Sequence, residues 1–386
     1  MIKSQFVATT LKGLEDVLET EIRELGGEDI RKLRRAVSFT GGLSLIYKMN
    51  FALRTALRVL YQIRSVKLKK DTDLYRNIFR IEWENYIAEN KTIAVKAVVN
   101  STMYNNSHYV ALRVKDAIVD RMREKTGKRP DVDVKNPDIP IHVHIDKDIL
   151  NISLDSSGEP LYKRGYRIRS LEAPLNEVLA AGMILMTGWK GNTNFIDPMC
   201  GSGTIPVEAA MIAKGIPPGI FRKSYSFQNW VDYDEELYSR LIESLMVSKT
   251  FEHKIYASDI SAKAVNVTRK NIEAALLEDI IDVSVQDFFD RKPHNDEGLL
   301  IMNPPYGERI KQDRINIFYG KIGNHLKTHY AGFNAWLLSS NFEAIKKIGL
   351  KPSKKKDLVN GNLDCKFIKY ELFKGKRSDF LRTIND

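Results

Sequence analysis

The first 64 residues combine short strand-like runs with two helical runs. Apolar residues recur at helical spacing before a pair of glycines, at Leu14, Val17, Leu18, Ile22 and Leu25. Strand-like segments occupy residues 5–10, 29–33, 36–40 and 56–63, and a second helix begins near Leu43. The order βαββαβ predicts a ferredoxin-like unit over residues 1–64.

A second unit is expected over residues 66–155, after a charged segment. It has a β-branched run, a basic helix and a pair of strand-like runs, at residues 92–99, 108–125, 139–145 and 149–154. Residues 156–170 then read as a linker, so the front of the chain is expected to be an α+β region.

From residue 171 to residue 386, helical and strand-like segments alternate. Helices are expected at 175–187, 205–214 and 262–277, and apolar strands at 194–197, 255–259, 281–285, 299–303 and 335–338. This alternation predicts an α/β domain with a Rossmann-like, doubly wound parallel sheet, interrupted by an insertion at residues 215–252. Ligands bind such sheets beyond the carboxyl ends of the strands.

The composition of the chain indicates the cellular compartment in which it is expected. The chain has 386 residues, which is too long for one ordinary domain, and no run of eighteen uncharged apolar residues. It has no evident export signal, and its two cysteines, Cys200 and Cys365, fit a reducing compartment. We therefore expect a cytoplasmic protein that does not contact membranes.

The net charge of +11 lies mostly in the front of the chain. Residues 1–170 hold 31 Lys or Arg and 22 Asp or Glu, whereas residues 171–386 hold 29 and 27. This imbalance favours a front region that binds nucleic acid, although a solvated basic surface remains open. The candidate RNA-binding residues come from the basic helix and from an aromatic-cationic run at 162–169: Arg113, Arg121, Lys128, Arg129, Lys163, Arg164 and Arg167.

A glycine-rich turn at residues 197–204 is the first candidate site. Gly201 and Gly203 allow tight backbone geometry, and Thr204 opens the following helix. Asp197, before the turn, suits a cationic amino group, and no Lys-Ser/Thr pair of a phosphate-binding loop is present. The turn is typical of an S-adenosylmethionine site, although alone it would suit several nucleotide cofactors. Cys200 is expected to be a small residue of this turn, not a nucleophile.

Acidic residues also follow the next two strands. Asp259 could accept both ribose hydroxyls of a nucleoside, with Ile260 packing on the adenine face. Asp287 could accept from an adenine amino group while Phe288 covers the ring. Each aspartate could instead be a helix cap, but several at successive strand ends favour a cofactor site.

Asn303-Pro-Pro-Tyr306 is the most specific motif. An aromatic or amide NH₂ is a poor nucleophile because its lone pair is delocalised, so acceptors on its hydrogens are needed. The Asn303 side chain and the Pro304 carbonyl can provide them, and Tyr306 can stack on a flipped base. The motif predicts methyl transfer to an NH₂ nitrogen. No metal is expected, since His142 and His144 lack cysteine or acidic partners.

These motifs together resemble THUMP-domain class I RNA methyltransferases, especially the bacterial branch similar to large-subunit ribosomal RNA guanine-N2 methyltransferases. The resemblance covers nearly the whole chain and includes Ala173-Pro-Leu175 with Glu177. It implies that Asp259 holds the ribose, that Asp287 holds the adenine amine and that ribosomal RNA or an assembly particle is the partner. The larger fused enzymes carry a second methyltransferase domain, so only N2-methylguanosine formation is expected here.

Two other functions remain open from the sequence. Asn-Pro-Pro-Tyr also occurs in DNA adenine-N6 methyltransferases, so the motif reports an NH₂ group and not the molecule that carries it. The chain could also be a ribosome-assembly factor that binds RNA with little methylation activity. The set of Asp197, Asp259, Asp287 and Asn303 favours an enzyme.

Overall fold

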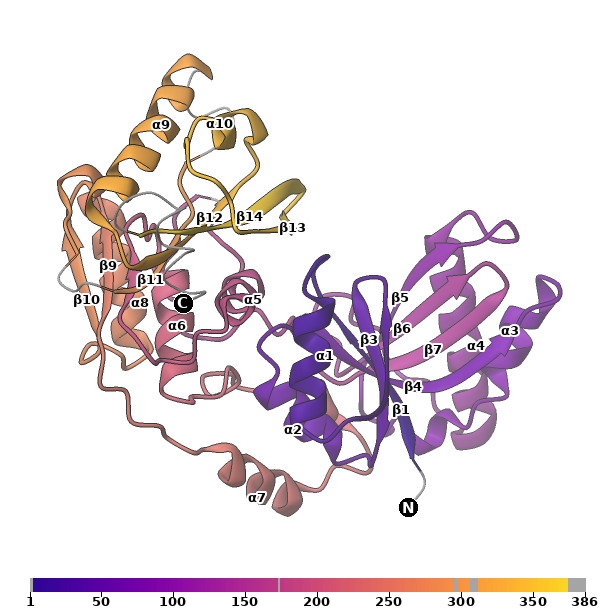
Figure 1. Ribbon diagram of the computed structural model, residues 1–386. Coiled ribbons are helices and arrows are strands. Elements are labelled where there is room, and N and C mark those ends of the chain that lie inside the picture. The colour runs from indigo at the N-terminus through magenta and orange to yellow at the C-terminus, as the bar shows by residue number, and fades with distance from the viewer. Residues whose placement is uncertain (1–2, 173, 294–296, 306–311, 374–386) are drawn as a thin grey trace. The chain divides into compact units, whose positions relative to one another are not determined.

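The structure is a computed structural model that describes residues 3–172, 174–293, 297–305 and 312–373 (Figure 1). It divides into two compact units. Unit 1 is built from the described parts of Met1–Thr10, Leu18–Lys163 and Arg222–Leu245. Unit 2 is built from Leu11–Val17 and the described parts of Arg164–Phe221 and Met246–Asp386.

The front of the chain follows the predicted βαββαβ order. Its elements are β1 (Ser4–Thr9), α1 (Glu15–Glu24), β2 (Glu28–Leu33), β3 (Ala36–Gly41), α2 (Leu45–Ala52) and β4 (Arg58–Lys67). Helix α1 buries Leu18 and Ile22 and ends before Gly26, whose φ of 94° is readily adopted only by glycine. A Cβ on Gly27 would lie 2.5 Å from the Ile22 side chain, so this glycine allows close packing.

The second half of unit 1 continues the same sheet. Its elements are α3 (Thr72–Phe79), η1 (Trp83–Asn85), β5 (Ile93–Asn100), α4 (Ser107–Thr126), β6 (Ile139–Asp146) and β7 (Ile149–Asp155). The strand order is β2-β3-β1-β4-β7-β6-β5, and only β5 and β6 pair in parallel. Because β4 pairs with β7, the two domains predicted at residues 1–64 and 66–155 share one seven-stranded sheet.

The segment Arg222–Leu245 falls in the predicted insertion, and it packs within unit 1. It carries η2 (Ser226–Asn229) and α7 (Glu235–Leu245). The Phe227 amide donates to the Ser156 carbonyl at 3.1 Å, and the Ser226 hydroxyl donates to the Asp138 carbonyl at 2.6 Å. The Phe227 ring is 1% exposed and lies 4.9 Å from the Tyr47 ring, between centroids. The segment is thus part of the unit 1 core.

Unit 2 contains the predicted alternation of helices and strands. Its elements are α5 (Glu177–Thr187), β8 (Phe195–Asp197), α6 (Thr204–Ala213), β9 (Ile255–Asp259), α8 (Ala262–Ala274), β10 (Ile281–Val285), η3 (Phe288–Asp290), β11 (Gly298–Met302), α9 (Gln312–His329), β12 (Phe333–Ser339), α10 (Phe342–Lys346), β13 (Lys354–Asn360) and β14 (Leu363–Glu371). The strand order is β10-β9-β8-β11-β12-β14-β13. The five strands from β10 to β12 are parallel. Strand β14 pairs antiparallel with β12, and β13 pairs antiparallel with β14.

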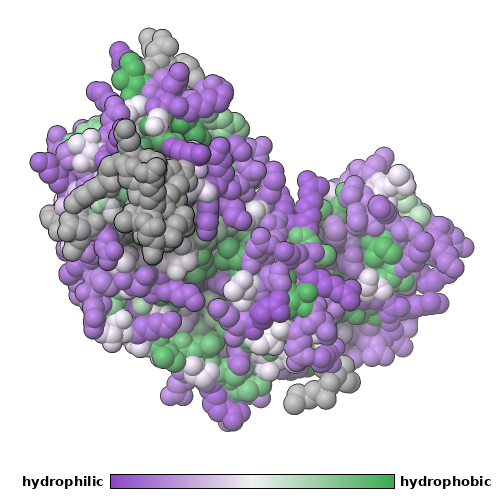
Figure 2. Space-filling model, viewed as in Figure 1, coloured by the Kyte–Doolittle hydropathy of each residue, from purple (hydrophilic) through white to green (hydrophobic). Residues whose placement is uncertain are grey.

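This topology creates one position where the strand order reverses, between β8 and β11. Parallel α/β sheets bind ligands beyond the carboxyl ends of the strands at such a reversal. Asp197 ends β8 and Asn303 follows β11, so both candidate motifs lie at this edge. The visible face of the molecule is mostly hydrophilic, with apolar side chains in small groups (Figure 2).

No helix within the described ranges is long and apolar enough to cross a membrane.

Candidate active site

Asp197 is a buried acid at the carboxyl end of β8. Its Oδ1 accepts from the Met199 amide at 3.2 Å, and its Oδ2 is buried without a hydrogen-bond partner among the described residues. Burial, with a smaller contribution from the nearby Asp259 charge, raises the pKa of Asp197 to about 8. The carboxyl is therefore largely neutral at pH 7, and a positively charged group beside it would favour ionisation.

The glycine turn after Asp197 is held by a hydrogen bond within the turn and by one from helix α8. Gly201 and Gly203 have φ values of 55° and 82°, in the left-handed region. A Cβ on Gly203 would lie 2.8 Å from the Thr268 Cγ2, so only glycine fits closely there. The Thr268 hydroxyl donates to the Gly201 carbonyl at 2.8 Å, and the Gly203 amide donates to the Cys200 carbonyl at 2.8 Å.

Cys200 is enclosed by this turn. Its side chain is 6% exposed, and burial raises the pKa of its thiol well above the usual range. The Cys200 amide donates to the Ser258 carbonyl at 2.9 Å. A buried, protonated thiol is a poor nucleophile, as expected for a small residue in a ligand-binding turn.

Asp259 joins β9 to the glycine turn. Its Oδ2 accepts from the Gly201 amide at 3.0 Å, and its Oδ1 accepts from the Ser261 amide at 2.9 Å. These two bonds orient the carboxylate, and each oxygen retains a lone pair for a ligand hydroxyl. Ile260 follows with 71% of its surface exposed, which is unusual for an isoleucine at a strand end.

The residues after β10 have different environments. Asp287 Oδ1 accepts from the Phe289 amide at 2.9 Å. Asp287 also lines a surface cavity of about 470 Å³ together with Phe289, Lys321, Asn324, His325 and Thr328. Phe288 is only 3% exposed, and its ring lies 4.7 Å from the His325 ring. The structure therefore does not support the prediction that Phe288 covers a bound adenine, because its ring already packs in the core.

Asn303 directly follows β11, which pairs with β8. Its Oδ1 is buried and has no hydrogen-bond partner among the described residues. Pro304 is buried beside it, whereas Tyr306 lies outside the described residues. An amide oxygen buried without a partner costs free energy unless a donor arrives, so Asn303 is suited to receive a ligand N–H group.

Arg291 is a buried cation that no sequence pattern singled out. Its side chain lies over the Tyr256 ring, 5.7 Å from the centroid, and the residue is 3% exposed. Burial lowers the pKa of Arg291, while the nearby Asp197 has a smaller, opposite effect. A single arginine without a surrounding motif gives no sequence signal for this position.

The predicted RNA-binding residues of unit 1 differ in exposure. Arg129 is exposed, and Lys128 is exposed while it pairs with Glu89 at 2.6 Å. Lys163 is also exposed and pairs with Glu159 at 2.6 Å. Arg113 lies over the Tyr75 ring, 5.1 Å from its centroid. Arg121 is largely covered, with 14% of its side chain exposed and its Nε 3.2 Å from Glu84.

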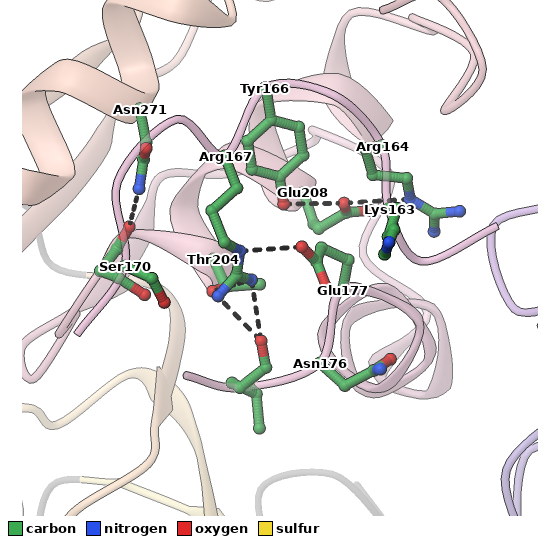
Figure 3. Close-up of polar contacts among 12 residues, drawn as sticks. Lys163, Arg164, Tyr166, Arg167, Ser170, Asn176, Glu177, Thr204, Glu208 and Asn271 are labelled. Carbon is green, nitrogen blue, oxygen red and sulfur yellow. Dashed lines mark hydrogen bonds and ion pairs between the residues drawn. The ribbon is translucent and has the colours of Figure 1, made fainter. Parts of the chain in front are cut away.

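Arg164 and Arg167 do not lie on an open surface (Figure 3). Arg164 pairs with Glu208 at 3.4 Å, and both side chains are at most 1% exposed. Arg167 Nε donates to Glu177 at 2.8 Å, with 16% of the arginine side chain exposed. Intramolecular carboxylates bind both cations, and these ion pairs argue against the predicted RNA contacts of Arg164 and Arg167.

No cluster of three or more metal-ligating side chains occurs in the part of the chain that the structure describes. His142 lies on β6, and burial, with a smaller contribution from the nearby Lys96, lowers its pKa to about 4. This histidine is therefore neutral at pH 7.

Three protein-family models match successive parts of the chain. Residues 164–369 match a family model described as "RMKL-like, methyltransferase domain". Residues 69–155 match the THUMP domain, and residues 5–60 match the RlmL ferredoxin-like domain.

Curated relatives carry RNA methyltransferase names. A Synechocystis sp. chain, provisionally named RNA methyltransferase slr0064, is 36% identical over 95% of this chain and 97% of its own length. The ribosomal RNA large subunit methyltransferase K/L of Syntrophotalea carbinolica is 35% identical over 95% of this chain. That match covers 53% of the relative, so the chain spans about half the length of the K/L relatives.

Solved structures share the fold across nearly the whole chain. SMU.472, provisionally named a methyltransferase and solved with S-adenosylhomocysteine (SAH), has a TM-score of 0.88 and 29% identity, covering 97% of this chain and all of its own. A Listeria monocytogenes chain, named by prediction as an N6-adenine-specific DNA methylase, has a TM-score of 0.87 and 28% identity. That match covers 96% of this chain and 97% of the Listeria chain.

S-adenosylmethionine is the cofactor of this methyltransferase domain, and the residues at the sheet edge fit it. Asp197 offers a buried, unpartnered oxygen to a cationic group, and Ile260 offers an exposed apolar side chain beside the oriented Asp259 carboxylate. The chain therefore belongs to the RMKL-like methyltransferase family, with a ferredoxin-like domain and a THUMP domain ahead of the methyltransferase domain.

Proposed function

We propose that this chain is an S-adenosylmethionine-dependent RNA methyltransferase that forms N2-methylguanosine in large-subunit ribosomal RNA. The names of its K/L relatives and the THUMP domain support RNA as the substrate. The +11 net charge, concentrated in the front half, is consistent with a polyanionic partner. Free ribosomal RNA and an assembly particle are both compatible with this charge.

The buried Oδ1 of Asn303 is the observation that carries the proposal. A guanine N2 amino group has two hydrogens, and an acceptor on one of them increases electron density on the nitrogen. Asn303 lies at the end of β11, next to β8 and its Asp197. We assign Asn303 Oδ1 as one acceptor and the Pro304 carbonyl as the second, with Tyr306 stacking on the base.

When bound, S-adenosylmethionine would supply a methyl group from its sulfonium, with S-adenosylhomocysteine as the leaving group; the guanine nitrogen would gain the methyl group and lose one proton to solvent. Asp197 would hold the cationic amino group, and Asp259 would bind the ribose hydroxyls. Gly201, Gly203 and Thr204 would keep the turn close to the ligand. These groups act by positioning and by hydrogen bonding, and no covalent enzyme intermediate is required.

A methyl-transfer assay on the full chain tests this proposal. The labelled cofactor is supplied with protein-free large-subunit ribosomal RNA from cells that lack the gene, and the RNA product is digested and identified by mass spectrometry. We expect N2-methylguanosine with the native chain and none with Asn303→Ala. An unchanged yield with Asn303→Ala would exclude the assigned acceptor.

DNA adenine-N6 methylation is the second candidate. Its support is the name of the Listeria monocytogenes chain, which shares the fold over nearly the whole length. The same assay with duplex DNA separates the two functions, since N6-methyladenine and N2-methylguanosine differ in fragmentation. Methylated DNA without methylated RNA would favour the second candidate.

A further inference from the structure

The chain leaves unit 1 at Lys163 and enters unit 2 at Arg164. The next residues, 164–171, lie at the end of the predicted linker 156–170, yet they carry a dense set of buried polar contacts (Figure 3). Tyr166 is 1% exposed, and its hydroxyl donates to Glu208 Oε1 at 3.0 Å. A segment with such contacts is a fixed part of unit 2.

Asn271, from α8, joins this segment to the glycine turn. Its Nδ2 donates to the Ser202 carbonyl at 2.9 Å and to the Arg169 carbonyl at 3.0 Å. Its Oδ1 accepts from the amides of Ile168 and Arg169, each at 3.1 Å. Asn271 is 1% exposed, and both its donors and its acceptor oxygen are used. One side chain thus holds two backbone segments together.

Arg167 contacts the start of two helices. Its Nη2 donates to the Thr204 hydroxyl, at the start of α6, and to the Leu175 carbonyl, before α5, both at 2.9 Å. Its Nε donates to Glu177 in the first turn of α5. The forked guanidinium therefore fixes the separation of α5 and α6 at the end of the glycine turn.

The cluster of buried contacts extends to Glu208, one turn further along α6. Glu208 is fully buried, four residues after Thr204, and accepts from both Arg164 and Tyr166. Thr204 and Glu208 are therefore on the same face of α6. Residues 164–171 are attached to α6 at two successive turns and to the glycine turn through Asn271.

We propose that residues 164–171 form a structural part of the cofactor site, in which Arg167 and Asn271 are positioning residues for the glycine turn. They act through the Ser202 carbonyl and the Thr204 hydroxyl and not by contact with the cofactor. This inference rests on the assignment of that turn to the cofactor. Gly201 and Gly203 have no side chains that restrict their backbones, so the turn conformation depends on its surroundings.

Removal of either side chain leaves buried partners without hydrogen bonds. Removal of Asn271 takes the donor from the Ser202 and Arg169 carbonyls. Removal of Arg167 takes a donor from the Glu177 carboxyl and from the Thr204 hydroxyl, which keeps only a 3.4 Å bond to the Leu175 carbonyl. The turn then samples other conformations, and cofactor affinity falls by the fraction of time spent in them. By the same linkage, a bound cofactor stabilises the segment.

Isothermal titration of the full chain with SAH tests the proposal. We expect Asn271→Ala and Arg167→Lys to weaken SAH affinity at least tenfold. At saturating cofactor, the kcat of each variant should stay within about threefold of the native value, because these side chains position the turn and do not touch the reacting atoms. The lysine variant keeps the charge beside Glu177 but cannot make the forked contact.

Arg169→Ala is the matched control. It has the same residue type in the same segment, but its side chain is exposed and only its backbone joins the cluster. We expect native SAH affinity for this variant. Circular dichroism and thermal melts establish that each variant is folded.

Hydrogen exchange on the native chain gives a readout that needs no variant. SAH should slow exchange of the Ile168 and Arg169 amides, which donate to Asn271. Unchanged exchange there, or native SAH affinity in folded Asn271→Ala and Arg167→Lys, would overturn the inference. Asp197→Asn separates the two assignments: if it weakens SAH binding and the cluster variants do not, only this inference fails. If none of the three weakens it, the turn assignment fails as well.

Discussion

At the scale of single residues, the site combines strong binding groups with a cost to stability. Asp197 is buried, one of its oxygens has no partner among the described residues, and burial raises its pKa to about 8. Asn303 Oδ1 is likewise buried without a partner among the described residues. Each group loses hydration without full compensation in the ligand-free protein, and a bound ligand restores the missing interaction.

Cofactor binding should release a proton through Asp197. At pH 7 its carboxyl is largely protonated, and a cationic ligand group favours the charged form, so about one proton per SAH should leave. Titration in buffers of different ionisation enthalpy measures this number. Asp197→Asn should release none, and equal release by the variant would assign the proton to another group.

Asp197 should also make the stability of the folded chain depend on pH. The folded-state pKa of Asp197 is above its usual value near 4, so its stabilising contribution is complete below about pH 4 and is lost as pH rises through about 8. Asp197→Asn should therefore raise the melting temperature of the ligand-free chain at pH 8.5. The two chains should differ less in melting temperature at pH 5. A melting temperature lower than native at pH 8.5 would contradict the buried-acid interpretation.

The sequence predicted which polar side chains lie at strand ends better than it predicted which residues contact the other side chains. Asp197, Asp259 and Asn303 lie at the sheet edge because the alternation of strands and helices fixes which residues follow a strand. The ion pairs of Arg164 and Arg167 were not foreseen, because a run of cations gives no sign of carboxylates that approach from other helices. The burial of Phe288 was not foreseen for the same reason, since its packing depends on the distant His325.

At the scale of elements, the main departure from the sequence pattern concerns the insertion. Its aromatic residues contact Tyr47 from α2, and local periodicity does not indicate contacts with a residue so distant in the sequence. Elements α9, β13 and β14 were also not predicted. The start of β13 is Lys-Lys-Lys-Asp, with all four residues exposed, so it lacks the apolar alternation that marks a strand.

Phe227 should stabilise unit 1 even though it lies in the predicted insertion at residues 215–252. Phe227→Ala removes a buried ring and should cost about 3–5 kcal/mol of unfolding free energy. The change should appear as faster hydrogen exchange in α2 and β4. Val231→Ala is the control from the same segment, since Val231 is 57% exposed and should lose little. Equal effects of the two substitutions would show that the segment is not part of the unit 1 core.

At the scale of the whole molecule, the excess positive charge and the candidate catalytic residues lie in different stretches of the sequence. The excess positive charge lies in residues 1–170, whereas the candidate catalytic residues lie in unit 2. Deletion of the front region is a poor test of this division, because Arg222–Leu245 would lose the core against which it packs. Surface substitutions leave that core intact.

Lys128 and Arg129 should contribute to RNA affinity by binding phosphates. Replacing both with alanine should reduce the salt dependence of RNA binding, lowering the slope of log K against log salt by about 0.7 to 0.9 for each phosphate that is no longer neutralised. Fluorescence anisotropy at several salt concentrations measures this slope. Lys346→Ala, an exposed cation of unit 2 paired with Glu343, should leave the slope unchanged. An unchanged slope in the double variant would place RNA binding elsewhere.

The central claim is that this chain methylates the guanine N2 of large-subunit ribosomal RNA. Mass spectrometry of ribosomal RNA nucleosides tests it most directly, in cells with the gene, without it, and with the gene encoding Asn303→Ala. We predict that N2-methylguanosine falls in the gene-free cells and is restored by the native gene but not by Asn303→Ala. An unchanged N2-methylguanosine content in gene-free cells would contradict the claim.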